Sequence, residues 1–424
     1  MSKTIFKNVK ILDSTGSQPY LGEVLVEDER ITEVSTGVGN INDPNALVID
    51  GRGQTLMSGL TDAHTHFTWD NRPFDQLGST PVEEHLLSTI DSAKTYIDYG
   101  YTMCFGAASA KARLDVVVRD AINSGRIPGP RYRANGMEIA TTSGELVDSI
   151  TQIADGVEGM RKVVRKTIGL GVDNIKMSLS GEEVTGTRAA EETFVTEEEL
   201  QVAVDEAHRR GVKVCAHARS RESIYLSLKT GVDMIYHASY IDDESMDMLE
   251  AAKDRVFVAP AINWLVATLY EAGEFGYSQE AAEMAGYAKE LEVAVKGIKE
   301  MRKRGIRVLP GGDYGFAWTP HGTYARDLEH FVKLFGYTEM ETILAATALG
   351  GELFGQANEL GKVQPGYYAD MILVDGDPLE DITILQDIEK ITAVMKNGQF
   401  HRRPHEDMII PMEGHEPAMN TATV

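Results

Sequence analysis

Cysteine is almost absent from this chain. Cys104 and Cys215 are the two cysteines among 424 residues, each stands alone in an apolar run, and no CxxC spacing occurs. Disulfide frameworks and zinc-finger cages both need several cysteines at short spacings. The sequence therefore excludes a small domain that is held together by either device.

Long apolar runs are missing as well. No window of about 18 uncharged apolar residues occurs, and the segment 1–13 lacks the apolar stretch of a secretion signal. The formal net charge is −24, which repels nucleic-acid phosphates and anionic membrane faces. We expect a soluble, cytoplasmic protein without a nucleic-acid or membrane partner.

Both ends of the chain carry short strand patterns. Alternating apolar residues and turn residues fill the first fifty positions, and a similar texture returns near the end, where Asn397-Gly398 is a strong hairpin signal. We expect residues 1–55 and 360–405 to form one composite β-sandwich domain. Residues 406–424 are expected to form an arm or a disordered tail.

Between these ends an apolar strand, a loop and an amphipathic helix alternate repeatedly. One clear helix pattern spans 196–211, which opens on a capping box from Thr196 to Glu199. Eight such units over 56–359 predict an α/β fold of the (β/α)8 barrel type. The expected barrel strands are 54–57, 101–105, 131–135, 172–177, 212–217, 234–237, 256–260 and 306–310.

Several metal-binding residue types fall at the carboxyl ends of these strands, where barrel enzymes keep their active sites. His64 and His66 are two residues apart, so in a strand both side chains face the same side. His217 and His237 each end a strand of consecutive units. Asp313 follows the eighth strand, where a carboxylate can bind a metal and also accept a proton.

Lys176 lies inside an apolar strand, where an unpaired ammonium is costly. One interpretation is a structural ion pair with Asp62 or Asp313. The other is reaction with CO2 to a carbamate, because an ammonium has no lone pair for a metal whereas a carbamate has two ligating oxygens. Considered by itself, Lys176 favours the ion-pair interpretation.

The set His64, His66, Lys176, His217, His237 and Asp313 resembles the metal constellation of the amidohydrolase superfamily. The entry segment Leu-Met-Ser-Gly-Leu-Thr-Asp-Ala-His-Thr-His and the late segment 361–374 are similar to that superfamily too, so the resemblance covers nearly the whole chain. Within it the chain resembles the branch of prolidase-like dipeptidases, imidazolonepropionase-like proteins, ochratoxin-degrading amidases, and phenylurea and molinate hydrolases.

The resemblance implies two divalent ions, with Zn2+ favoured, and a hydroxide that they activate. His64 and His66 would bind one ion, His217 and His237 the other, and carbamylated Lys176 would bridge them. Asp313 would bind the first ion and shuttle the proton. Relatives are often homo-oligomers, which the resemblance therefore implies here. Neutral histidines are needed for ligation, so activity should fall at low pH.

The substrate is less specified, because it is recognised by the loops after the strands. An arginine could grip a carboxylate, and an aromatic lining suits an aryl or alkyl group. We expect a small-molecule C–N substrate such as an N-aryl amide, urea or carbamate. A dipeptide or N-acyl amino acid is the alternative, and a non-catalytic assembly protein is a second alternative. A cyclic-amide hydrolase or deaminase stays a third option, although the His-Ala-Glu signature usual in deaminases is absent. The candidate substrate residues are Arg219, Arg221, Tyr240, Trp264, Trp318 and His321.

Overall fold

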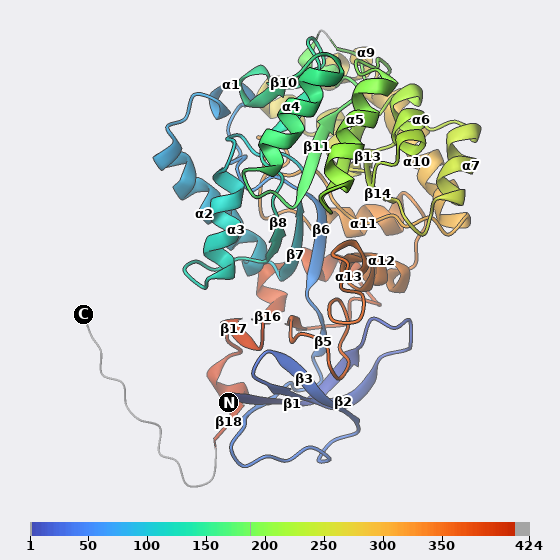
Figure 1. The fold of residues 1–424 in the computed structure, drawn as a ribbon. Helices are drawn as coiled ribbons and strands as arrows, with labels where there is room; N and C mark the ends of the chain where they lie inside the picture. Colours follow the sequence, from blue (N-terminus) through green and yellow to red (C-terminus); the bar gives the residue numbers. More distant parts are fainter. Residues whose placement is uncertain (1, 187, 412–424) are drawn as a thin grey trace.

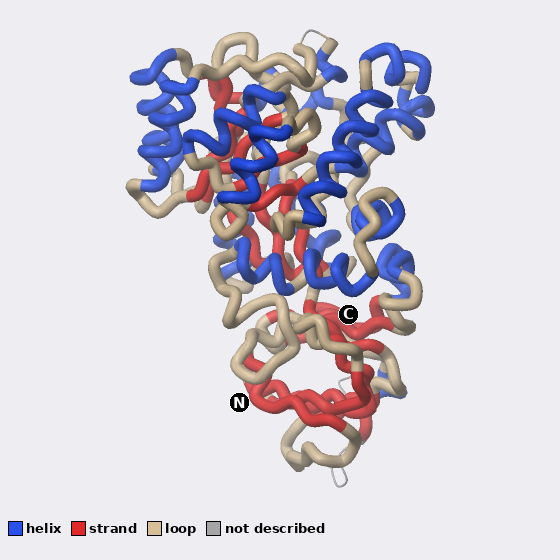
Figure 2. The backbone as a smooth tube through the Cα atoms, turned by 90° about the vertical axis from the view of Figure 1, so that its right-hand side faces the viewer, coloured by secondary structure: helices blue, strands red, loops and turns tan. Residues whose placement is uncertain are grey.

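The computed structural model describes residues 2–186 and 188–411. A β-rich sheet lies at one end of the molecule, and a larger α/β unit lies above it (Figure 1). Seen from the side, the strands of the larger unit are surrounded by helices, whereas the sheet at the other end is built mainly of strands and loops (Figure 2). Among the described residues, none of the helices combines the length and the apolar character needed to cross a membrane.

The terminal sheet has nine strands that come from both ends of the chain. Its order is β17-β16-β15-β5-β1-β2-β3, with β4 paired to β1 and β18 paired to β4. The first half of β1 pairs with β4 and the second half with β5, so the sheet forks there and encloses its own apolar core. The strands are β1 (Lys3–Leu12), β2 (Tyr20–Glu27), β3 (Arg30–Thr36), β4 (Leu47–Asp50), β5 (Thr55–Ser58), β15 (Met371–Val374), β16 (Ile391–Lys396), β17 (Gln399–Arg402) and β18 (Ile409–Ile410).

The larger unit is a (β/α)8 barrel. In the two parallel sheets of this unit, the strands that belong to the barrel run in the orders β6-β7-β8 and β11-β12-β13-β14, and β9 (Glu138–Ala140) and β10 (Thr151–Ile153) extend the second sheet. The eighth barrel strand is the segment 306–309. The other barrel strands are β6 (Leu60–Thr65), β7 (Tyr101–Gly106), β8 (Arg131–Arg133), β11 (Asn174–Ser178), β12 (Lys213–Ala218), β13 (Met234–His237) and β14 (Phe257–Ala259).

Backbone hydrogen bonds close these strands into a ring. The carbonyl of Ala134, just beyond β8, accepts the amide of Asp173 at 2.7 Å, which joins β8 to β11. Val308 forms a parallel bridge with β14. The carbonyl of Pro310 accepts the amide of Ala63 in β6 at 3.0 Å. The last strand therefore returns to the first, and the interior is filled by buried side chains as in other barrels.

Helices cover the outside of the barrel (Figure 1). The capping box predicted for the helix after residue 196 is present, because Thr196 Oγ1 accepts the amide of Glu199 and the Glu199 side chain accepts the amide of Thr196. The helices are α1 (Phe74–Leu77), α2 (Val82–Asp98), α3 (Leu114–Asn123), α4 (Gly156–Ile168), α5 (Glu197–His208), α6 (Arg221–Thr230), α7 (Asp243–Ala251), α8 (Ile262–Tyr270), α9 (Gln279–Ala285), α10 (Tyr287–Lys303), α11 (Arg326–Lys333), α12 (Glu339–Ala346) and α13 (Ala348–Leu353).

Two sequence predictions at the domain junction differ from the structure. The segment 54–57 was expected to be the first barrel strand, but β5 pairs with β1 and β15 in the terminal sheet. The barrel begins instead at β6, after Gly59, where a Cβ atom would lie 2.2 Å from the Thr102 side chain. His64 therefore lies within the first barrel strand and not after it.

The predicted arm at 406–424 also begins differently, because β18 pairs with β4 as a strand of the terminal sheet. The remainder of that arm, 412–424, lies outside the described residues. The Asn397-Gly398 hairpin is confirmed, since β16 and β17 flank it as antiparallel partners. The exact division of the chain at residues 55 and 360 remains a prediction.

Candidate metal centre

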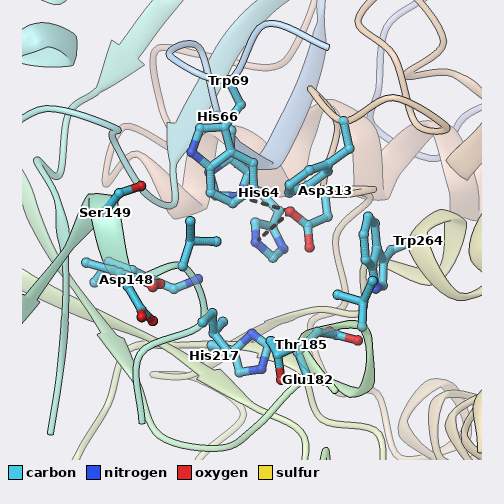
Figure 3. Close-up of a pocket in the computed structure, with 16 residues that line it drawn as sticks. His64, His66, Trp69, Asp148, Ser149, Glu182, Thr185, His217, Trp264 and Asp313 are labelled. Carbon is cyan, nitrogen blue, oxygen red and sulfur yellow. Dashed lines mark hydrogen bonds and ion pairs between the residues drawn. The ribbon is translucent and has the colours of Figure 1, made fainter. Parts of the chain in front are cut away.

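A cavity of about 440 Å³ opens at the carboxyl ends of the barrel strands, and five of the six predicted metal ligands line it (Figure 3). They are His64, His66, Lys176, His217 and Asp313. The sixth, His237, lies behind them, with its ring centroid 4.4 Å from that of His217 and 5.2 Å from that of His64. The fold thus brings together side chains that are separated by up to 249 positions in the sequence.

The closest part of this cluster is formed by two histidines and one carboxylate. Asp313 Oδ1 lies 2.9 Å from His66 Nε2 and 3.6 Å from His64 Nε2. The three ligating atoms lie within 4.8 Å of one another, and all three residues are buried. This spacing is suited to one metal ion that is shared by three donors.

The hydrogen bonding of His66 leaves room for a cation beside Asp313. Its Nδ1 lies 3.1 Å from the carbonyl of Ala108, which can only accept, so Nδ1 carries the proton and Nε2 carries a lone pair. That lone pair faces Asp313 Oδ1, and neither atom has a hydrogen-bond partner among the described residues. Two buried acceptors in contact repel each other unless a proton or a metal cation lies between them. Burial lowers the pKa of His66, which disfavours the proton. The donor set therefore fits a divalent metal.

His217, like His66, is oriented by a backbone carbonyl, although through the other ring nitrogen. Its Nε2 lies 3.1 Å from the carbonyl of Gly181, which leaves the lone pair on Nδ1. Both ring nitrogens of His237 are buried and have no hydrogen-bond partner within the described part of the chain. A second group of donors thus lies next to the first.

Two of these residues have unusual backbone conformations. His237 has φ of 70° and Asp313 has φ of 63°, although neither is glycine. Left-handed conformations of such residues are uncommon and cluster at functional sites. The backbone is therefore strained at two of the predicted ligands.

Burial lowers the pKa of His64, His66, His217 and His237. The charged imidazolium is disfavoured because the barrel interior solvates it poorly. All four rings are therefore neutral near pH 7, which is the form that ligates metals.

Lys176 is buried at the bottom of the cavity, and neither predicted ion-pair partner binds it. Asp62 accepts from the His64 amide and the Tyr96 hydroxyl, at 2.8 and 2.9 Å, and Asp313 contacts histidines instead. Within the described residues no carboxylate lies in ion-pair range of Lys176, whose Nζ lies 4.2 Å from the Tyr236 ring centroid. Burial lowers the pKa of Lys176. The structural ion pair is thus not formed.

The sides of the cavity are mainly apolar. Trp69, Phe316 and Trp264 form a continuous aromatic surface, with ring centroids 4.3 Å apart for the first pair and 4.8 Å for the second. Other lining residues come from the segment 146–149 and from the loop after β11. Sequence reasoning did not select Trp69, Glu138, Glu182, Val184, Thr185 or the segment 146–149. Only the closeness of Trp69 to the His64-His66 pair could have indicated one of them.

Of the six predicted substrate residues, Trp264 alone is among the described residues that line the cavity. Arg219 is fully buried and its guanidinium is held by Glu182 and Glu290. Arg221 has a largely exposed side chain that pairs with Asp242. The prediction that an arginine grips the substrate therefore has no support in the geometry.

The three remaining candidates surround the cavity without lining it. The Lys289 ammonium lies over the ring of Tyr240, with its nitrogen 5.3 Å from the ring centroid. Trp318 packs behind Trp264 and donates to the Thr268 hydroxyl at 2.9 Å. His321 contacts the carbonyl of Trp69 and so holds the loop that carries this wall residue.

Comparison with known proteins agrees with this fold. Residues 55–400 match the model of the amidohydrolase family. An ochratoxinase from Aspergillus niger is 29% identical over 381 residues, which cover 83% of this chain and 77% of the relative. Its solved structure has a TM-score of 0.82 at 24% identity, and covers 95% of this chain and 96% of its own.

A solved prolidase in complex with N-methylphosphonate-L-proline is also similar. It is 25% identical with a TM-score of 0.85, and the match covers 95% of this chain and 100% of the prolidase. Molinate hydrolase and phenylurea hydrolase B share the fold, with TM-scores of 0.77 and 0.74 at 21% and 20% identity. The matches cover 94% of this chain in both cases, and 94% and 96% of those chains.

The barrel, its terminal β domain and the polar cluster at its mouth define a hydrolase that acts on C–N bonds. The chain belongs to the amidohydrolase family. The predicted branch is confirmed as well, because ochratoxinase, prolidase, molinate hydrolase and phenylurea hydrolase are all among its relatives or structural neighbours.

Proposed function

We propose that this chain is a binuclear metal-dependent amidohydrolase that cleaves an amide-type C–N bond in a small apolar molecule. The observation that carries the proposal is the contact between His66 Nε2 and Asp313 Oδ1, two buried acceptors that a bound cation would bridge. The substrate class follows from the aromatic lining above this contact.

Two groups of residues would hold the metals. His64, His66 and Asp313 would bind one ion, and His217 and His237 the other. Nitrogen and carboxylate oxygen donors suit Zn2+. Two such ions, when bound, would make a water molecule nucleophilic near neutral pH and polarise the carbonyl of the substrate.

Lys176 would bridge the two groups as a carbamate. Burial favours its neutral amine, whose lone pair can attack the carbon of CO2, with loss of one proton from nitrogen. The product is anionic and offers two oxygens where the unmodified side chain offers none. The lack of an ion-pair partner for Lys176 in the described residues supports this modification.

Asp313 would move the proton. Both histidine contacts use Oδ1, which leaves Oδ2 to accept a proton from the attacking water and to give it to the departing nitrogen. The nitrogen must be protonated to leave, so one carboxylate serves both halves of the reaction.

The cavity favours an uncharged aryl or alkyl group beside the scissile bond. Trp69, Phe316 and Trp264 provide an apolar surface, and the described lining contains no arginine. An N-aryl amide, urea or carbamate fits these walls. The similarity to a prolidase favours a dipeptide or N-acyl amino acid as the second candidate. A non-catalytic assembly role is disfavoured, because all six ligand types are present and five line one cavity.

A metal analysis and a substrate panel test the proposal together. We expect about two divalent ions per chain, and turnover of anilides or phenylureas that a strong chelator abolishes and metal restores. Dipeptide turnover without aryl-amide turnover would replace the first substrate class by the second. Hydrolysis that a chelator never affects would refute the metal mechanism.

A further inference from the structure

A buried ionic cluster adjoins the metal centre on the side of His217 and His237, and one of its members, Glu182, also lines the cavity. Arg219 Nη1 lies 2.6 Å from Glu290 Oε1, and Nη2 of the same arginine contacts Glu182. The hydroxyl of Ser239 donates to the same Glu290 oxygen at 2.6 Å. Arg219 and Glu290 are both 0% exposed, so bulk solvent screens their pairing little.

The cluster is linked to the two histidines through short pieces of backbone. Arg219 lies two residues after His217 at the end of β12, and Ser239 lies two residues after His237 at the end of β13. One carboxylate of α10 therefore holds the exits of both strands at once. The carbonyl of Arg219 also accepts the amide of Tyr240 at 2.9 Å, which joins the two exits directly.

The backbone between these contacts is strained. His237 has φ of 70° and Ala238 has φ of 52°, two consecutive left-handed residues with side chains. Such conformations persist only where the surrounding contacts fix them. Ser239 follows directly, so its hydrogen bond to Glu290 holds the strained turn at its far end.

We propose that Arg219, Ser239 and Glu290 are positioning residues that hold His237 in its strained conformation beside His217. The inference rests on the proposed metal centre, of which these two histidines form the second half. When the contact to Glu290 is lost, the turn relaxes toward ordinary φ values and the His237 ring moves away from His217. The second metal ion then binds more weakly, while the first, at His64, His66 and Asp313, keeps its affinity.

Metal affinity is the readout, measured by zinc competition against a chromophoric chelator on the full-length protein. The wild type should show two binding steps. Glu290→Gln should weaken one step at least tenfold and leave the other within about twofold. Ser239→Ala, which removes one hydrogen bond and no charge, should weaken the same step about threefold, so the test does not depend on the more disruptive variant.

Two further variants separate positioning from a general loss of stability. Glu206 is another fully buried glutamate among arginines, with Arg161, Arg165 and Arg210 within 2.8 Å, but it lies in α5 outside the barrel. Glu206→Gln should lower the melting temperature without changing either zinc step. Glycine at position 238 adopts the left-handed φ without strain. When Ala238→Gly is added to Glu290→Gln, it should therefore recover at least half of the decrease in the logarithm of the zinc affinity.

The outcomes divide clearly. The proposal is supported if Glu290→Gln weakens one zinc-binding step selectively, Ala238→Gly rescues that step, and Glu206→Gln changes neither step. Equal weakening of both steps, an unchanged isotherm in Glu290→Gln, or failure of the rescue overturns it while leaving the two-metal hydrolase intact. A wild type that binds no zinc at all overturns both.

Discussion

The indole of Trp69 stacks on the imidazole of His66, with ring centroids 3.4 Å apart and planes only 3° from parallel. The aromatic surface of the cavity thus begins at a proposed metal ligand and continues through Phe316 to Trp264. A substrate carbonyl near His66 would have its aryl or alkyl group against this surface. The predictions for Trp264 and His321 depend on that arrangement.

Trp264→Ala should raise KM for an aryl amide about tenfold and change kcat much less. The indole forms the end of the aromatic surface away from His66, and burying apolar area against it stabilises the bound substrate before the reaction. Trp318→Ala is the matched control, because Trp318 packs behind Trp264 and does not line the described cavity. An equal effect of the two substitutions would show that the wall acts through folding and not through contact with substrate. Initial rates over a range of substrate concentrations measure both constants.

Lys176→Ala should reduce activity to background, and acetate or propionate should restore part of it. A short carboxylate can occupy the place of the carbamate and offers the same two oxygens. Lys213→Ala serves as the control: Lys213 lies on the neighbouring strand, but its ammonium donates to the Leu353 carbonyl away from the cavity. Rescue of Lys176→Ala by carboxylates, absent with chloride, supports the bridge. An unaltered rate in Lys176→Ala would exclude it.

The sequence predicted which side chains gather at the site better than it predicted their surroundings. His64 and His66 could be found because alternation in a strand and the position at a barrel strand end are local properties of the chain. The six ligand types converge because eight strands end at one rim, so the fold alone brings them close. The closed ring, the hairpin at Asn397 and the capping box at Thr196 followed from equally local patterns.

Ion-pair partners that distant parts of the chain supply could not be predicted from local patterns in the same way. Arg219 looked available for a substrate carboxylate, but Glu290 arrives from α10, 71 positions later, and holds it in the interior. Arg221 differs only by two positions and is on the surface. Neither ion pair has a sequence signal, because a side chain's partner depends on how the loops pack and not on spacing. The first barrel strand was misplaced for a related reason, since only Gly59 separates β5 from β6 and only the pairing distinguishes the two short strands.

Asp313→Asn should lower kcat about 10³-fold, within the range for loss of a general acid or base. The amide keeps the shape of the carboxylate but cannot take and return a proton. KM should change far less, because the aromatic surface remains. Metal content should be measured on the same samples, since a loss of zinc that matches the loss of rate would assign Asp313 a role in binding alone. A variant with full activity would contradict its assignment as the proton carrier.

His321 should make the loop that carries Trp69 sensitive to acid. Its Nδ1 is 3.1 Å from the Tyr324 hydroxyl and its Nε2 contacts the Trp69 carbonyl. Burial lowers the pKa of His321 to about 4, compared with 6.5 in the unfolded chain. Between these two values the unfolded state binds a proton that the folded state does not, so the free energy of unfolding falls as pH falls.

This pH dependence of the free energy of unfolding predicts a measurable difference between the wild type and His321→Gln. Each pH unit below 6.5 costs the folded wild type about 1.4 kcal/mol through this one group, whereas glutamine does not titrate. From pH 7 to pH 5 the stability advantage of the wild type over the variant should therefore shrink by about 2 kcal/mol. Urea denaturation of both proteins at the two pH values, with the same buffer ions and metal removed, measures the change. An advantage that stays constant would mean that His321 accepts a proton in the folded state as readily as in the unfolded chain, and its hold on the Trp69 loop would then be independent of pH.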